Sequence, residues 1–135
     1  MDRAEPSVTI LLDVDNTLLD NDRAKADLDR ELGALLGAEE RARFWRMYEA
    51  IRDETGRVDI PLTLARFDAA NGESSLARRA ALAGLFMRFP YADYLFPEAL
   101  ATVAHLRRLG QVAIVSDGDP IFQPSKIWRA GLTAA

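Results

Sequence analysis

The stretch VTILLDVDNTLLD, residues 8–20, places two carboxylates directly behind a short apolar run. Its first five residues, Val8 to Leu12, are β-prone and predict a strand buried on both faces, as in a parallel sheet. Asp13 follows at once, and Asp15 comes two residues later. Because an unpaired charge beside a buried strand costs free energy, the two acids need a structural or chemical reason.

The composition limits the classes of protein that the chain can represent. The 135 residues suffice for one domain, and 49% hydrophobic with 28% charged residues argues against disorder. A net charge of -4 provides no basic surface for nucleic acid or for an anionic membrane. The absence of cysteine excludes disulfides, thiolate metal sites and cysteine nucleophiles. We therefore expect a cytoplasmic protein with no nucleic-acid and no membrane partner.

Helical periodicity dominates the chain after the acidic stretch. Apolar residues recur at three- and four-residue spacing, which indicates amphipathic helices, and glycine or proline marks several of their ends. The predicted helices cover residues 22–36, 39–55, 61–67, 97–109, a fourth segment capped by residue 74 or 75 that runs to 89, and a last segment from 121 or 125 to 130. A second short apolar strand, VAIV, is predicted at 112–115.

The order of these elements predicts an α/β fold with an insertion. A helix directly before the second strand is a normal crossover, so the two strands should be parallel neighbours. The helical block that follows the first strand is too long for a single crossover. We therefore expect a partial core of parallel strands from residues 1–20 and 91–135, with a helical cap from residues 21–90.

Polar side chains leave both predicted strands at the edge where open α/β sheets bind ligands. Asp13 and Asp15 follow the first strand, on the same side of an extended chain, and Ser116 follows the second. Asp13 is a candidate nucleophile or metal ligand, and Asp15 a candidate acid–base group. The Ser116 hydroxyl and the backbone N–H groups of residues 116–119 could hold an anionic oxygen. Oxygen ligands favour Mg²⁺ over zinc.

Two other interpretations stay open at this point. Asp13, Asp15 and Asn16 are residue types that also form simple strand-ending turns, although the serine after the second strand favours a site. A phospho-acceptor receiver domain also combines aspartate, a hydroxyl and lysine. Its accepting aspartate normally ends a later strand, whereas here the acids end the first.

The two strand ends carry a family resemblance. LLDVDNTLLD resembles the first signature of the haloacid dehalogenase-like superfamily of hydrolases, an apolar strand followed by Asp-x-Asp-x-Thr. VAIVSDGD resembles the second signature, an apolar strand followed by serine or threonine. The helical insertion lies where that superfamily carries a cap. The resemblance implies a Rossmann-like hydrolase core with an inserted helical cap, here incomplete.

The resemblance also implies a mechanism. Asp13 would attack phosphorus to form an aspartyl-phosphate, and Asp15 would protonate the leaving oxygen and then deprotonate the hydrolytic water. Mg²⁺ would be held by Asp13 and by the backbone carbonyl of Asp15. Haloacid dehalogenases of the superfamily lack the second aspartate, because a halide needs no proton. Asp15 therefore favours a phosphate ester over an organohalide as substrate.

The remaining residues of the two signatures would bind the phosphoryl group. Thr17 would support the loop after the first strand. Ser116, with Asp117 and Gly118, would hold the phosphoryl oxygens of a small phosphorylated substrate. The sequence does not identify that substrate further.

The sequence departs from the family in its later signatures. A lysine and a set of acids should follow later strands, but the sequence stops at Ala135 after two strands. We interpret Lys126, in the last predicted helix, as a helix-face lysine and not as the third-signature residue. We therefore expect a weak or inactive hydrolase with an exposed sheet edge open to oligomerisation. The alternative is a truncated, non-catalytic family member that acts only by binding a ligand or a protein.

A few other side chains are weaker candidates. Arg52, Arg57 and Tyr94 could recognise substrate, although solvent-facing charge and hinge packing explain them more simply. Trp45 and Trp128 lie on amphipathic stripes, which predicts core or helix-contact positions.

Overall fold

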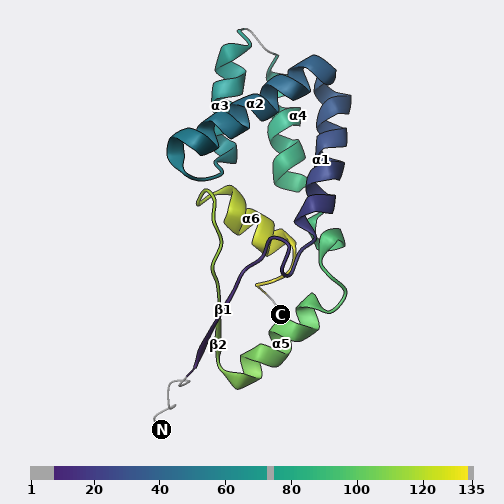
Figure 1. Ribbon diagram of the computed structural model, residues 1–135. Helices are drawn as coiled ribbons and strands as arrows, with labels where there is room; N and C mark the ends of the chain where they lie inside the picture. Colours follow the sequence, from purple (N-terminus) through teal and green to yellow (C-terminus); the bar gives the residue numbers. More distant parts are fainter. Residues whose placement is uncertain (1–7, 73–74, 134–135) are drawn as a thin grey trace.

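The computed structural model describes residues 8–72 and 75–133. Helices α1–α4 form one group and the strands with α5 form another, with α6 between them (Figure 1). None of the helices in the described ranges is long and apolar enough to span a membrane. The elements in chain order are β1 (Thr9–Leu12), α1 (Asn21–Leu36), α2 (Ala38–Thr55), α3 (Ile60–Ala70), α4 (Leu76–Arg88), the 3-10 helix η1 (Tyr91–Tyr94), α5 (Ala99–Leu109), β2 (Gln111–Ile114) and α6 (Phe122–Arg129).

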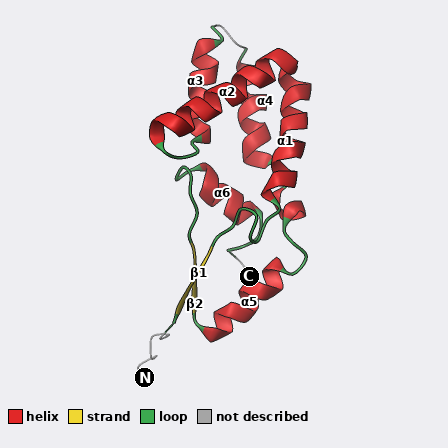
Figure 2. Cartoon of the chain, in the orientation of Figure 1, coloured by secondary structure: helices red, strands yellow, loops and turns green. Residues whose placement is uncertain are grey.

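The two strands pair in parallel, which confirms the expected α/β arrangement. The two strands lie side by side in the described chain (Figure 2). In their register, Thr9 lies opposite Gln111 and Leu12 opposite Ile114. A parallel pair needs a long crossover, and here the helical elements from α1 to α5 supply it. Both strands therefore end at the same edge of the sheet.

The sheet is covered on one face only within the described residues. Leu12 and Ile114 pack against the core and share a groove with side chains of α5 and α6. On the opposite face Leu11 is 64% exposed, and Val115, just after β2, is 56% exposed. The prediction that the first strand is buried on both faces is wrong for these residues, because no described helix packs on the Leu11 side.

Helices α1–α4 share an aromatic core. Leu32, Phe44, Phe67 and Phe86, one from each helix, are at most 1% exposed. The Phe44 ring centroid lies 5.3 Å from those of both Phe67 and Phe86. Rings at such separations stabilise a core beyond the area that they bury. This aromatic group is part of one continuous core, because the Phe86 ring centroid also lies 6.3 Å from that of Phe122 in α6.

The glycines predicted to end the first two helices do so. Helix α1 ends before Gly37, with φ of 82°, and α2 ends before Gly56, with φ of 74°. Glycine adopts these left-handed conformations without the steric cost of a Cβ. The boundaries of the predicted core and cap remain predictions, and residues 1–7, 73–74 and 134–135 of those ranges lie outside the described residues.

Two neighbouring segments connect the helical block to the sheet. The Asp20 N–H donates to the Tyr94 carbonyl over 2.8 Å, and the Phe96 N–H donates to the Leu18 carbonyl over 2.9 Å. The segment before α1 is therefore paired with the segment around η1, which the sequence patterns did not predict as a helix. These hydrogen bonds fix how α1 leaves the sheet.

The two tryptophans differ in environment. Trp45 is partly buried, and its indole N–H donates to Asp29 over 2.6 Å. Trp128 is 67% exposed, so the prediction of a core or helix-contact position is wrong for this residue. Helix α6 buries Phe122 and Lys126, four residues apart, and Trp128 falls on the other side of that stripe.

A matched pair of leucine substitutions tests the helical core. Leu32→Ala should lower the free energy of unfolding by about 2–5 kcal/mol, because Leu32 is 0% exposed and its truncation leaves a cavity. Leu76→Ala, at an 81% exposed position, should change it by no more than about 0.5 kcal/mol. Urea unfolding followed by circular dichroism measures both, and equal losses would contradict the assigned core.

Candidate active site

Asp13 and Ser116 lie at the carboxyl ends of β1 and β2. Together with Asp117 they line an open hollow of about 320 Å³ at the edge of the sheet. The parallel register brings them together, since β1 ends at Leu12 and its partner Ile114 ends β2. The first strand and the second strand thus contribute polar groups to one hollow, as their positions in the sequence suggested.

The loop after β1 is fixed by side-chain hydrogen bonds. The Thr17 hydroxyl donates to one carboxylate oxygen of Asp13 over 2.8 Å. Asn16 adopts a left-handed conformation, with φ of 57°, and its side-chain carbonyl oxygen accepts the N–H groups of Asn21 and Asp22 at the start of α1. The Asp13 carboxylate is therefore oriented by Thr17, in a loop anchored to α1.

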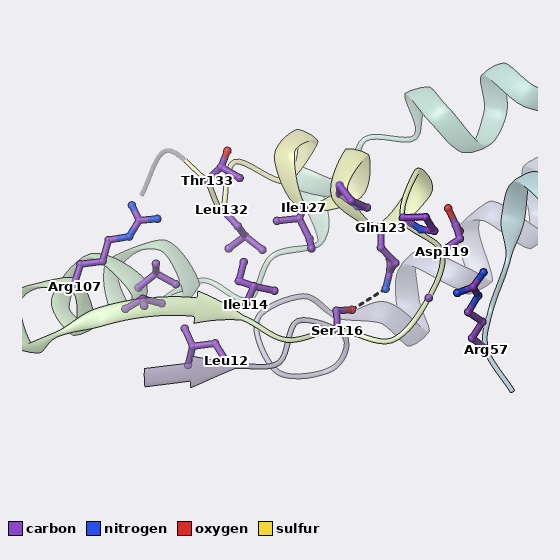
Figure 3. Close-up of a pocket in the computed structure, with 15 residues that line it drawn as sticks. Leu12, Arg57, Arg107, Ile114, Ser116, Asp119, Gln123, Ile127, Leu132 and Thr133 are labelled. Atoms are coloured by element: carbon purple, nitrogen blue, oxygen red, sulfur yellow. Dashed lines mark hydrogen bonds between the residues drawn. The ribbon is translucent and has the colours of Figure 1, made fainter. Parts of the chain in front are cut away.

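The loop after β2 is fixed by Gln123. Its side-chain N–H₂, at the start of α6, donates to the Ser116 hydroxyl over 2.8 Å (Figure 3). The same group donates to the Asp117 carbonyl over 2.7 Å. Gly118 has φ of 131°, and a Cβ there would lie 2.5 Å from the Gln123 side chain. Gly118 lines the groove between β2 and α6 and not the hollow of Asp13. The tight turn therefore requires a glycine at position 118.

Lys126 is not a helix-face lysine, and that prediction is wrong. Its side chain is 5% exposed, and Nζ donates to Asp15 Oδ1 over 2.6 Å and to Asn21 Oδ1 over 2.8 Å. The physical reason is that α6 packs beside the strand ends with Phe122 and Lys126 on its buried side. One signal in the sequence could have shown this. Lys126 lies four residues after Phe122, on the apolar stripe of the helix, and a lysine buried there must find a partner.

Asp15 opens onto a different hollow from Asp13. This pocket of about 270 Å³, here named the cap pocket, lies between the helical block, the strand-end loops and α6. Asp117 lines both hollows and so stands between them. Its lining includes the side chains of Asp15, Lys25, Trp45, Tyr48, Tyr91 and Lys126.

Two tyrosines bring neutral hydroxyl groups to the cap pocket. Tyr91 is 3% exposed, and burial, followed by the negative charge of Asp15, raises the pKa of its hydroxyl well above the usual value. Burial also raises the pKa of Tyr48, with the charges of Glu49 and Asp15 acting in the same direction. Both phenols therefore remain protonated hydrogen-bond donors at neutral pH.

Asp119 serves the structure and not the strand-end hollow. It is 2% exposed, and its carboxylate accepts the N–H groups of Ile121 and Phe122 at the start of α6, over 2.9 and 2.6 Å. Its second oxygen accepts the N–H of Ile60, the first residue of α3, over 3.3 Å. Asp119 therefore links the loop after β2 to the helical block, and both of its oxygens are committed to backbone donors.

The other candidate residues from the sequence differ in their surroundings: one lines the cap pocket, and the other two contact acidic side chains. Arg52 lines the cap pocket, whereas Arg57 pairs with Asp59 over 3.7 Å. The Tyr94 hydroxyl donates to Asp27 over 2.7 Å, which lowers the pKa of that carboxyl. Lys25 and Tyr91 were not predicted as pocket residues, because no local sequence pattern distinguishes them from other helix and linker residues.

The oxygen ligands at the strand ends fit Mg²⁺ in part. Mg²⁺ is commonly held by one or two carboxylates together with water and substrate phosphate oxygens. Asp13 offers such a carboxylate, whereas one oxygen of Asp15 is taken by Lys126. Within residues 8–72 and 75–133, no cluster of three or more acidic, histidine or cysteine side chains could enclose a metal ion. Any Mg²⁺ bound here would therefore depend on Asp13, backbone oxygen and the substrate.

Comparison with known families now places the chain. Residues 8–133 match the family of haloacid dehalogenase-like hydrolases. The chain belongs to this family. A solved structure from Burkholderia xenovorans LB400, assigned to the haloacid dehalogenase-like hydrolases, is 37% identical with a TM-score of 0.82. The alignment covers 93% of this chain and 58% of that one. The resemblance of the two strand-end motifs to a haloacid dehalogenase-like core with a helical cap is thus confirmed.

More distant structures share the fold. YfnB of Bacillus subtilis, a HAD-hydrolase solved with magnesium, is 22% identical with a TM-score of 0.53. L-2-haloacid dehalogenase of Xanthobacter autotrophicus is 23% identical with a TM-score of 0.54. Each alignment covers 93% of this chain, but only 60% and 53% of the respective relative. This haloacid dehalogenase-like chain therefore spans little more than half the length of these proteins. No curated protein sequence matches it.

A double-mutant cycle tests the Lys126–Asp15 pair. Urea unfolding of Lys126→Met, Asp15→Ala and the double variant should give a coupling energy of about 1–2 kcal/mol. The coupling should fall below that of a fully buried pair, because the Asp15 side chain is 34% exposed.

The chain offers a matched control in its other lysine. Lys25→Met removes an exposed ammonium that packs near two aromatic rings, and should cost at most about 1 kcal/mol. A coupling energy near zero between positions 15 and 126 would show that the contact does not stabilise the fold.

Proposed function

We propose that this protein hydrolyses small phosphate esters through Asp13 and Asp15. The observation that carries the proposal is the hollow in which Asp13, oriented by Thr17, stands beside Ser116 of the neighbouring strand. Phosphoryl transfer requires a positioned nucleophile and donors around the phosphoryl oxygens. The Ser116 hydroxyl and the backbone N–H groups of the following turn are suitable donors, and Asp117 lies at the same edge.

The proposed reaction has two steps. A carboxylate oxygen of Asp13 attacks phosphorus, the bond from phosphorus to the leaving oxygen breaks, and Asp15 gives that oxygen a proton. Asp15 then takes a proton from water as the water attacks the aspartyl-phosphate, which releases inorganic phosphate and restores Asp13. Mg²⁺, held by Asp13 and the Asp15 backbone carbonyl, would neutralise charge on the phosphoryl oxygens.

Lys126 positions the Asp15 side chain. Its ammonium holds one carboxylate oxygen of Asp15, and Asn21 fixes the ammonium from the start of α1. The second carboxylate oxygen of Asp15 remains for the leaving group on the cap-pocket side. An alkoxide leaving group needs this proton and a halide does not, which favours a phosphate ester over a haloacid as substrate.

We further propose that these 135 residues alone are a weak catalyst. The third and fourth signatures of the family have no evident counterpart in the sequence, and Asp119 is committed to helix N-termini. The alternative, a family member that acts only by binding, is favoured by one observation, the exposed Leu11 face of the sheet. That face and the sheet edges also support self-association. A cytoplasmic location remains a prediction from the composition.

Substitution of the proposed nucleophile tests the function. With Mg²⁺ and p-nitrophenyl phosphate, the chain should release nitrophenol slowly, and Asp13→Asn should reduce the rate by about 10³-fold or to background, because the amide cannot attack phosphorus. Release of the chromophore, followed with and without EDTA, measures both the rate and the Mg²⁺ dependence.

Asp53→Asn is the matched control, because it makes the same change at an exposed position on α2. It should leave turnover unchanged. Equal turnover by Asp13→Asn and the unmodified chain would refute the proposed mechanism. Absence of turnover in the unmodified chain, with phosphate still bound, would favour the non-catalytic alternative.

A further inference from the structure

The cap pocket has a chemical end and a recognition end. Asp15 and Lys126 stand at the end formed by the strand-end loops and α6. Lys25 of α1 and Trp45 and Tyr48 of α2 stand on the helical block. In the proposed reaction the leaving group occupies this pocket, so the side chains of the helical block would contact its far end.

Lys25 supplies a positive charge to that end. Its Nζ lies 5.2 Å from the ring centroids of both Trp45 and Tyr48, and these rings line the pocket. Among the described residues, no carboxylate forms an ion pair with it. The rings hold the ammonium at the pocket without neutralising it.

The acids nearest to Lys25 have other partners. Asp22, Asp29 and Glu49 share a neighbouring surface hollow with it. Asp22 bonds with Asn16, Asp29 accepts the Trp45 indole N–H, and Glu49 pairs with Arg52. The helical block contributes two cations to the pocket, Lys25 and Arg52. Arg52 is paired with Glu49, whereas Lys25 has no carboxylate partner among the described residues. An incoming anion could therefore pair with the Lys25 ammonium.

The pocket also contains donors suited to an anion. Within the described chain, neither the Tyr48 hydroxyl nor the Tyr91 hydroxyl forms a hydrogen bond, although the Tyr91 residue is only 3% exposed. Neither oxygen is fully enclosed by protein, so each hydroxyl can donate to a ligand oxygen in the pocket. The volume of about 270 Å³ is at the lower end of the range for small-molecule sites.

We propose that the cap pocket selects phosphate esters whose leaving group carries a second negative charge, a carboxylate a few carbon atoms from the phosphate, and that Lys25 recognises this carboxylate. This inference rests on the proposed function, because it assigns the leaving group to the pocket of Asp15. The Tyr48 and Tyr91 hydroxyls complete the contacts.

A pair of probes that differ in one group provides the test. 3-Phosphoglycerate and glycerol 3-phosphate have the same three-carbon skeleton, with a carboxylate in one and a hydroxymethyl group in the other. Isothermal titration calorimetry of the full chain with Mg²⁺, and of Asp13→Asn so that turnover cannot consume the probe, gives each Kd. The carboxylate probe should bind about tenfold more tightly, which is the expected effect of one charge-assisted hydrogen bond.

Lys25→Gln should bring the ratio of the two Kd values close to one, while the Kd of inorganic phosphate stays unchanged. The control is Arg46→Gln, which removes the same charge from an exposed site on α2 and should preserve the ratio. A ratio near one in the unmodified chain, or a tenfold ratio that survives Lys25→Gln, overturns the inference. Failure of the proposed function would instead appear as no hydrolysis of any ester, whatever the ratio of affinities.

Discussion

The buried ammonium of Lys126 is the constraint that organises this molecule. A charge that is 5% exposed is stable only when paired, and its two oxygen partners come from Asp15 and Asn21. These residues belong to the loop after β1 and to the start of α1, whereas Lys126 belongs to α6. One side chain therefore fixes three segments relative to one another. It also decides that Asp15 faces the cap pocket.

The separation of Asp13 from Asp15 suits the proposed chemistry. In an in-line displacement at phosphorus, the attacking and leaving oxygens lie on opposite sides of the phosphoryl group. Asp13 opens onto the hollow at the sheet edge and Asp15 onto the cap pocket, with Asp117 lining both. A nucleophile on one side and a proton donor on the other is the arrangement that such a displacement requires. Thr17 holds one carboxylate oxygen of Asp13 in place, and Lys126 holds one carboxylate oxygen of Asp15.

The parts of the fold that depend on local chemistry were predictable from the sequence. Helix ends at Gly37 and Gly56 follow from the freedom of glycine, and the meeting of Asp13 with Ser116 follows from parallel pairing. Which face of α6 is buried was not predictable, because this depends on packing between segments far apart in the chain. Lys126 was misassigned for that reason. The exposure of Leu11 was not predictable either, because it depends on whether another element covers that face of the sheet.

Binding and chemistry are carried by different parts of the molecule. Lys25 and its aromatic neighbours belong to α1 and α2. Asp13 and Ser116 belong to the strand ends, and their hydrogen-bond partners lie in the strand-end loops and α6. A change of charge at Lys25 therefore leaves the nucleophile's surroundings intact. Asn21 is the exception, since it starts α1 and also holds Lys126, so a shift of the helical block would reach Asp15 through this contact.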